Sequence, residues 1–206
     1  MNIITKINSE YIKDKEKAIA ALYKPVRVLV SGSFDEAMAN KFREDMSLVM
    51  DTPQDVIPIV IDSYGGQVFS LLPMWDVIDA CKKSKKIITI ASGKAVSCGA
   101  ALFTAGDLRY VEPGAEVMVH EVSAAAWGKN VEVQADAEHI KKLNARVLNK
   151  MSTNIGKSPG YFADKIHDRG HTDWWMEAQE ALDVGIATNV GCPNIVLDVQ
   201  VTCTVQ

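Results

Sequence analysis

The residues of this chain best suited to chemistry are a serine, a histidine and an aspartate that lie far apart in the sequence. Ser97 lies between a predicted strand and a helix of small residues, in GKAVSCGAALFTAGD. A serine hydroxyl attacks poorly unless a neighbouring base takes its proton. His120, which ends the apolar run EVMVH, is a candidate base because imidazole titrates near neutral pH. Asp173, in TDWWMEAQEALDVGIAT, could fix the imidazole tautomer and stabilise its charged form.

Each of these three residues also has a purely structural interpretation. Serine is a preferred N-cap residue, so Ser97 could simply cap the helix that follows it. His120 could be a hydrogen-bonded core residue or a strand-edge residue. Asp173 could cap a helix or lie in solvent, and Asp164 and Asp168 are nearby rivals for its role. It is the combination that points to nucleophilic catalysis.

A glycine pair could supply the remaining part of such a site. Gly65 and Gly66 follow a predicted strand in VIDSYGGQV, and glycine permits a backbone turn that a side chain would block. Such a turn exposes N–H groups that could hold the oxyanion of a tetrahedral intermediate. A plain loop is the alternative interpretation.

Alternating strands and helices must position these residues. Apolar, β-branched runs predict strands at 26–32, 56–62 and 86–92, with two shorter strands at 108–112 and 116–120. Apolar spacing predicts helices at 35–50, 68–81 and 131–151, a short buried helix at 97–105 and a helical stretch at 177–185 before a strand-like 186–188. This alternation is typical of parallel strands joined by βαβ crossovers in a single α/β domain.

Composition excludes several classes of protein. The chain has 206 residues and a net charge of −4, with no basic stripe that would indicate a nucleic-acid partner. No run approaches the roughly 20 apolar residues of a membrane span, and the amino terminus does not resemble a signal peptide. The four cysteines form no CxxC pair, which argues against a zinc site or a disulfide framework. We therefore expect a soluble cytoplasmic protein without a metal.

Taken in order, the motifs resemble those of the Clp protease proteolytic subunit (ClpP) family. That family has a Ser-Pro-Gly-Gly turn after a strand, a Ser followed by Met-Gly, a Met-Ile-His strand, and an Arg-Asp segment before Met-Ser-Ala-Glu-Glu-Ala. This chain has DSYGG, SCGA, MVH and TDWWMEAQEALDVGIAT in the same order, over residues 26–190. The resemblance implies Ser97 as nucleophile, His120 as general base, Asp173 as the orienting carboxylate, and the N–H groups of Gly66 and Cys98 as the oxyanion hole.

The resemblance also implies an α/β fold, the ClpP/crotonase-like superhelix of βαβ units with a protruding handle helix. An arm at 1–24 would precede one peptidase domain at 25–206, with the handle region at about 122–155. The activity implied is that of a serine endopeptidase that forms an acyl-enzyme and needs no cofactor. Its substrates would be peptides or unfolded proteins. The chain would form a homo-oligomer of heptameric rings stacked as a tetradecamer, although the apolar stripe of the handle could equally pack within one subunit.

Several positions depart from the family pattern. Tyr64 replaces the proline of the turn, Cys98 replaces the methionine after the nucleophile, and Val122 replaces a proline two residues past the histidine. The segment before Asp173 is a few residues longer than usual, and we interpret His171 within it as a bystander. The amino terminus does not resemble the family's axial loops, which argues against a Clp-type ATPase partner. A divergent, phage-encoded form would fit these differences.

Other functions stay open. The chain could be a catalytically silent structural subunit of the same fold, or a crotonase-type acyl-CoA enzyme, although those enzymes usually rely on carboxylates. A Ser–Lys peptidase would need Lys94 as its base, only three residues before Ser97. Cys98 could be a thiol nucleophile, but a cysteine in a packed helix of small residues is more often inert.

Overall fold

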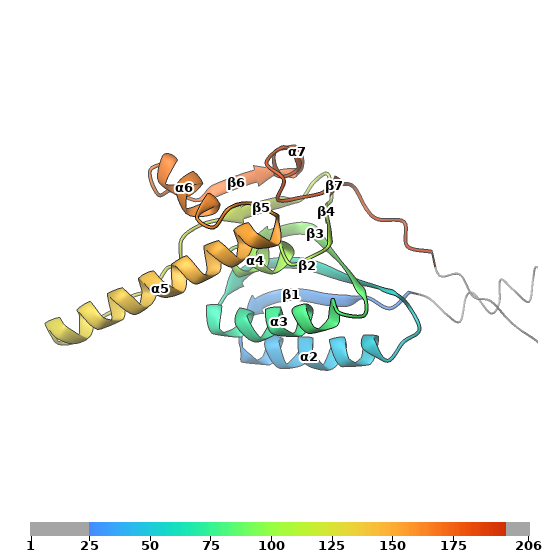
Figure 1. Cartoon of the computed structure of the whole chain (residues 1–206), viewed down its shortest axis with the longest axis horizontal. Coiled ribbons are helices and arrows are strands. Elements are labelled where there is room, and N and C mark those ends of the chain that lie inside the picture. The colour runs from blue at the N-terminus through green and yellow to red at the C-terminus, as the bar shows by residue number, and fades with distance from the viewer. Residues whose placement is uncertain (1–24, 197–206) are drawn as a thin grey trace, which may run out of the picture. The chain divides into compact units, whose positions relative to one another are not determined.

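A mostly parallel β-sheet flanked by helices forms the frame of the computed structural model, which describes residues 25–196 (Figure 1). All its elements lie within one compact unit, Arg27–Pro193. The strands are β1 (Val28–Phe34), β2 (Val56–Gly66), β3 (Lys86–Val96), β4 (Leu108–Val111), β5 (Glu116–Val119), β6 (Trp174–Glu177) and β7 (Asn189–Val190). The helices are α2 (Glu36–Met50), α3 (Val68–Cys81), α4 (Cys98–Phe103), α5 (Asn130–Asn154), α6 (Tyr161–Asp168) and α7 (Ala178–Asp183). The predicted arm at 1–24 lies outside the described residues.

The sheet runs in the order β1-β2-β3-β4-β7 with parallel neighbours. Its central strand β3 serves two partners. The first half of β3 pairs with β4, and its last three residues, Lys94–Val96, pair in parallel with β5. On its other edge β5 pairs with β6, which runs antiparallel. The predicted mixed α/β class with parallel crossovers is therefore confirmed.

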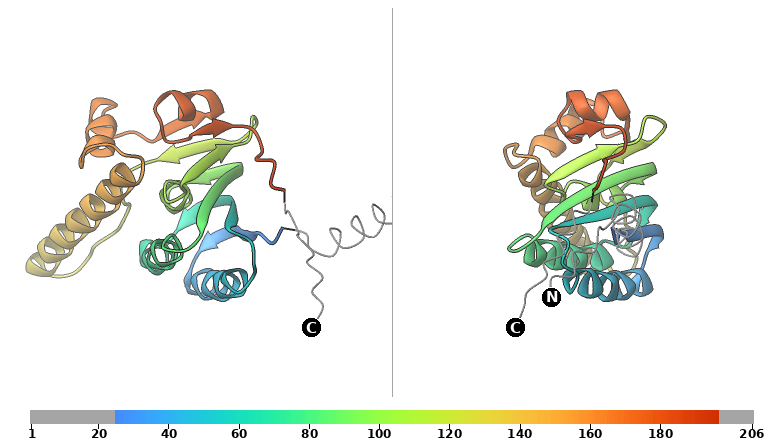
Figure 2. Two further views of the ribbon diagram at one scale, coloured as in Figure 1. Left: turned by 45° about the vertical axis from the view of Figure 1, so that its right-hand side comes forward. Right: turned by 90° about the vertical axis from the view of Figure 1, so that its right-hand side faces the viewer.

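The core explains why these segments form a sheet. Ile57, Ile59 and Ile61 of β2 are fully buried, as expected for a strand with neighbours on both edges and apolar layers against it. Helices α2 and α3 lie side by side against β1–β3 (Figure 2). The amphipathic α2 buries Phe42 and Met46 there. The core thus fixes the positions of the central strands and of the residues that follow their carboxyl ends.

Some predicted boundaries were wrong. Strand β2 continues through the glycine pair to Gly66, and β3 continues to Val96. The strand expected at 186–188 is instead the two residues Asn189–Val190, which pair with Tyr110 and Val111 of β4. Helix α6 and strand β6 were not predicted. The burial of Trp174–Glu177 alternates with the period of a strand, but the sequence Trp-Trp-Met-Glu does not alternate between apolar and polar residues, so it gave no strand signal.

Helix α5 contains the predicted helix at 131–151 but divides into two halves. Its last turns bury Val147 and Met151 against the rest of the chain. Its first half projects away from the sheet (Figures 1 and 2), with Val131 71% exposed and Ala137 also exposed. The apolar stripe therefore packs within the subunit at one end and remains unpaired at the other. None of the helices within residues 25–196 combines the length and the apolar character that a membrane-spanning helix needs.

Candidate active site

Ser97 lies at the tight junction between β3 and α4. Its backbone has φ 56° and ψ −118°, a region that costs energy for a residue with a side chain. The N–H of Ser97 donates to the Met118 carbonyl of β5 at 2.9 Å. Although Ser97 occupies the N-cap position of α4, its hydroxyl makes no capping hydrogen bond. The side chain is therefore presented for another contact, which the simple capping interpretation does not explain.

Gly65 allows this junction to pack against β2. A Cβ on Gly65 would lie 2.7 Å from Ser97 Cβ and 2.8 Å from the Val96 carbonyl oxygen, distances that real side chains do not adopt. The φ of Gly65 is +92°, which also favours glycine. The first glycine of the DSYGG motif therefore allows the backbone of β2 to pack closely against the junction that carries Ser97.

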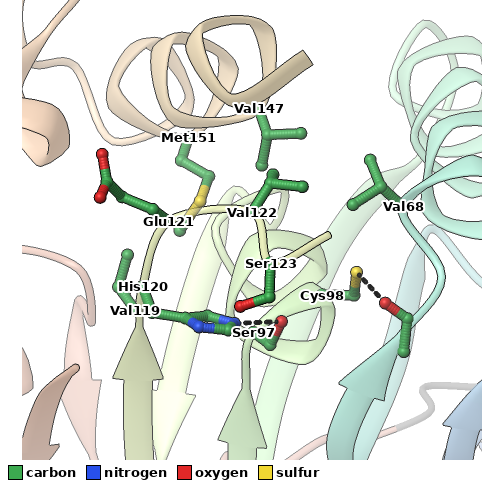
Figure 3. Close-up of a pocket in the computed structure, with 11 residues that line it drawn as sticks. Val68, Ser97, Cys98, Val119, His120, Glu121, Val122, Ser123, Val147 and Met151 are labelled. Atoms are coloured by element: carbon green, nitrogen blue, oxygen red, sulfur yellow. Dashed lines mark hydrogen bonds between the residues drawn. The ribbon is translucent and has the colours of Figure 1, made fainter. Parts of the chain in front are cut away.

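His120 is the partner of the Ser97 hydroxyl. It follows the last residue of β5, and because β3 and β5 are parallel, their carboxyl ends meet at one edge. The Nε2 atom of His120 lies 2.8 Å from Ser97 Oγ (Figure 3). This distance is within hydrogen-bonding range, so the geometry suits transfer of the hydroxyl proton to the imidazole.

The Asp173 carboxylate lies on the Nδ1 side of the His120 ring, at more than hydrogen-bonding distance. It immediately precedes β6, whose Trp174 is in register with Val119, the residue before His120. The Oδ1 atom of Asp173 lies 3.7 Å from His120 Nδ1, beyond a normal hydrogen bond. The Asp173 side chain is 54% exposed, so the two tryptophans that follow it do not shield it from solvent. Strand alternation turns Trp174 into the core and leaves Trp175 46% exposed.

The rivals Asp164 and Asp168 belong to α6. The described carboxylate that pairs with the His120 ring is that of Asp173.

Gly66 and Cys98 line the same cavity as Ser97 and His120. Cys98 is the first residue of α4, and the first N–H groups of a helix have no partner within it. The Cys98 thiol donates to the Gly66 carbonyl at 3.3 Å and so connects the two backbone segments. The start of α4 therefore offers the Cys98 N–H next to Ser97, while the role of the Gly66 and Cys98 N–H groups as an oxyanion hole stays a prediction.

The cavity has a volume of about 140 Å³. Its polar end is the Ser97–His120 pair, and its opposite wall is apolar (Figure 3). That wall combines side chains from α3, from the segment after β5 and from the buried end of α5: Val68, Val122, Val147 and Met151. Such a cavity is suited to bind an apolar side chain of a substrate whose reacting bond lies next to Ser97 Oγ. Within residues 25–196, no cluster of three or more His, Cys, Asp or Glu side chains is placed to bind a metal ion.

The buried environment of the Cys98 thiol does not favour it as a nucleophile. Burial of the side chain raises the pKa of the Cys98 thiol to about 11. The group therefore stays a neutral thiol near pH 7, whereas the thiolate is the reactive form. Its structural role is the hydrogen bond to Gly66.

Lys94 is engaged away from the serine. Its ammonium lies 2.5 Å from Asp62 Oδ1 and 4.6 Å above the centre of the Tyr64 ring. The hydrogen bond to Asp62 raises the pKa of the Lys94 ammonium, so the group remains protonated at neutral pH. It also lines a different cavity, together with Asp62 and Tyr64. These contacts leave Lys94 unsuited to act as the base for Ser97.

One contact beside the site was missed by sequence reasoning. His171, interpreted above as a bystander, has its Nδ1 atom 3.1 Å from Glu121 Oε2. The two residues are 50 positions apart, and no pattern in the sequence pairs them.

Comparison with known proteins places this geometry in context. A family model described as Clp protease matches residues 11–193. The chain is 28% identical over 166 residues to the ATP-dependent Clp protease proteolytic subunit 2 of Tropheryma whipplei (strain Twist), covering 79% of this chain and 89% of that protein. It is 29% identical over 167 residues to the ATP-dependent Clp protease proteolytic subunit 1 of Streptomyces coelicolor (strain ATCC BAA-471 / A3(2) / M145), covering 78% of this chain and 74% of that protein.

Proposed function

Because the chain belongs to the Clp protease family, we propose that it is a serine endopeptidase whose nucleophile is Ser97. The family and the names of its relatives support a peptidase role. The observation that carries the proposal for this chain is the 2.8 Å contact between Ser97 Oγ and His120 Nε2. The family match also favours a peptide over an acyl-CoA substrate.

The chemistry follows from the positions of the groups. His120 Nε2 accepts the Ser97 proton while Oγ forms a bond to the carbonyl carbon of the peptide. The resulting oxyanion accepts hydrogen bonds from the N–H groups of Gly66 and Cys98. As the C–N bond breaks, the imidazolium returns the proton to the leaving amine, and an acyl-enzyme remains on Ser97. Water, deprotonated by His120, then attacks the ester and releases the acid and the free hydroxyl.

Asp173 has the role of orienting carboxylate in this proposal. A carboxylate beside Nδ1 holds the proton on that nitrogen and leaves Nε2 free to accept the serine proton. The separation of 3.7 Å must shorten by several tenths of an ångström for a direct hydrogen bond. The exposed position of Asp173 leaves room for that movement.

An oligomeric chamber is the second part of the proposal. The projecting half of α5 exposes Val131, and the segment just before it exposes Trp127 at 83%. Apolar side chains in such positions are suited to burial against another copy of the chain. We place them in the contact between two heptameric rings, which would enclose peptides or unfolded proteins in a cytoplasmic tetradecamer. A Clp-type ATPase partner is not part of the proposal.

A catalytically silent subunit is the second candidate. It is favoured by one observation: Asp173 is 3.7 Å from His120 and about half exposed. A triad with its third member unengaged would leave the hydroxyl only weakly activated. The same fold and the same assembly would then serve a structural purpose.

A serine-directed fluorophosphonate probe tests the proposal. Wild-type protein should become labelled and should cleave unfolded casein, and Ser97→Ala should abolish both signals. Ser84→Ala is a matched control, because Ser84 lies past the end of α3, where its hydroxyl donates to the Cys81 carbonyl. Absence of labelling and cleavage in a folded, assembled wild-type protein would contradict the enzyme and support the silent subunit.

A further inference from the structure

Glu121 and His171 lie beside the two residues that would form the His–Asp part of the site. Glu121 directly follows His120, and His171 precedes Asp173 by two positions. The Nδ1 atom of His171 lies 3.1 Å from Glu121 Oε2. The contact therefore joins the two chain segments that carry the imidazole and the carboxylate.

The β-ladder by itself does not fix the distance between those segments. The antiparallel pairing of β5 with β6 ends at Val119 and Trp174. His120 and Asp173 are the next residue on each side, just past the last pair. Side-chain contacts beyond the ladder must therefore determine how closely the two approach.

The segment before Asp173 holds the His171 ring in a defined place. His171 has φ 61°, in the left-handed region that few residues other than glycine adopt. Its N–H donates to the Ile166 carbonyl at 3.0 Å, and Thr172 Oγ1 donates to the Arg169 carbonyl at 2.9 Å. The His167 ring of α6 meets the His171 ring nearly edge-on at 5.2 Å. A strained backbone kept in place by several contacts points to a requirement for that ring position.

Glu121 is held from the opposite side by α5. Asn144 Oδ1 accepts the N–H of Val122 at 2.9 Å, and Asn144 Nδ2 lies 3.4 Å from Glu121 Oε1. The Glu121 carboxylate points away from the Ser97–His120 pair (Figure 3). Held there, it does not compete with Asp173 for the imidazole.

We propose that the Glu121–His171 pair is a positioning contact that keeps Asp173 within reach of His120. Its effect on catalysis rests on the proposed function, whereas its effect on the position of Asp173 does not. The two side chains are 42% and 56% exposed, and exposed ion pairs add little to folding stability. The contact therefore acts on the geometry of the site and has little influence on the melting temperature.

Two substitutions at His171, to asparagine and to aspartate, test the contact, because the two new side chains share one shape and differ in charge. His171→Asn keeps an N–H donor near the position of Nδ1, and His171→Asp has the same shape but repels Glu121. Asparagine and aspartate both tolerate the left-handed backbone. With a short fluorogenic peptide, we expect His171→Asn to retain wild-type kcat. His171→Asp should lower kcat roughly tenfold, the size of effect expected for a small misplacement of a catalytic group, with KM and melting temperature little changed. The double variant Glu121→Gln with His171→Asp should recover activity, because glutamine can donate to aspartate.

Crystal structures of the same variants supply a readout that does not need activity. The His120 Nδ1 to Asp173 Oδ1 distance should increase in His171→Asp and stay near the wild-type value in His171→Asn. Asp45→Asn, which removes an exposed ion pair with Lys41 on α2, is the matched control and should change neither this distance nor kcat. Equal distances and equal kcat in the two His171 variants would overturn the inference. A displaced Asp173 in a protein without Ser97-dependent cleavage would reject the proposed function and keep the positioning contact.

Discussion

Ser97 Oγ and His120 Nε2 lie 2.8 Å apart although 23 positions separate the two residues in the chain. The contact follows from one feature of the sheet: Lys94–Val96 of β3 pair in parallel with Glu116–Met118 of β5. Each residue is placed just beyond its own strand, and the backbone N–H of Ser97 donates directly to Met118. A nucleophile and its base are thereby brought to one edge of the sheet by backbone pairing.

Replacing the imidazole should nearly abolish peptide cleavage. His120→Ala removes the group that accepts the serine proton, and we expect kcat/KM to fall by roughly 10⁴-fold or more. Lys94→Met should leave kcat/KM within a few-fold of wild type, because Lys94 is paired with Asp62. Steady-state kinetics on a fluorogenic peptide measures both. The opposite pattern, with loss only in the lysine variant, would identify a Ser–Lys enzyme.

The Cys98 thiol should resist alkylation in the folded protein. With a pKa raised to about 11 by burial, only about one thiol in a thousand is ionised at pH 8. Iodoacetamide should modify the exposed Cys192 at least tenfold faster, as followed by mass spectrometry of the peptides. In urea the difference should disappear. Preferential labelling of Cys98 in the native state would instead support a reactive thiol.

A methyl group at Gly65 should disturb both stability and activity. Gly65→Ala places a Cβ about 2.7 Å from the Ser97 Cβ and forces alanine into φ +92°. We expect a loss of about 1–3 kcal/mol in unfolding free energy, together with reduced labelling of Ser97. Gly114→Ala is the matched control, because nothing lies within 4 Å of a Cβ there. Urea denaturation curves compare the two variants, and equal stability would contradict the close approach of β2 to the serine.

A charge on the projecting half of α5 should weaken the proposed ring-to-ring contact. Val131 is 71% exposed, so Val131→Asp should leave the fold of the subunit intact by circular dichroism. Sedimentation velocity should show the assembly separating into single rings. Glu138→Gln, a neutralising change on the same exposed half, should leave the assembly unchanged. An unaltered sedimentation coefficient in Val131→Asp would remove this half of α5 from the contact.

The frame of the molecule could be predicted from the sequence because its strands are continuous apolar runs. Ile57, Ile59 and Ile61 belong to a continuous apolar segment that predicts a buried strand, and all three are buried. The helix predicted at 68–81 has the observed bounds Val68–Cys81. Such signals are local, since the pattern within one segment decides whether it is strand or helix. Once parallel crossovers are assigned, residues that follow neighbouring strands are expected to meet.

The parts that escaped prediction depend on contacts between distant segments. The 3.7 Å gap at Asp173 and its exposure depend on contacts beyond the last pair of β5 and β6, Val119 with Trp174. The pairing of Glu121 with His171 depends on a loop with a left-handed residue that is not glycine. Neither leaves a periodic signal, because each arises from a single tertiary contact.

The division of β3 between two partners has a mechanical consequence. Its first half is locked between β2 and β4, whereas β5 is attached to it through three register pairs, Lys94–Glu116, Ala95–Val117 and Val96–Met118. The nucleophile thus follows a strand with partners on both edges, whereas the base follows a buried strand whose pairing with β3 is short. Opening of this short pairing would separate the base from the hydroxyl and leave the pairing of β1–β4 intact, and amide hydrogen exchange at Val117–Val119 would report how often it opens.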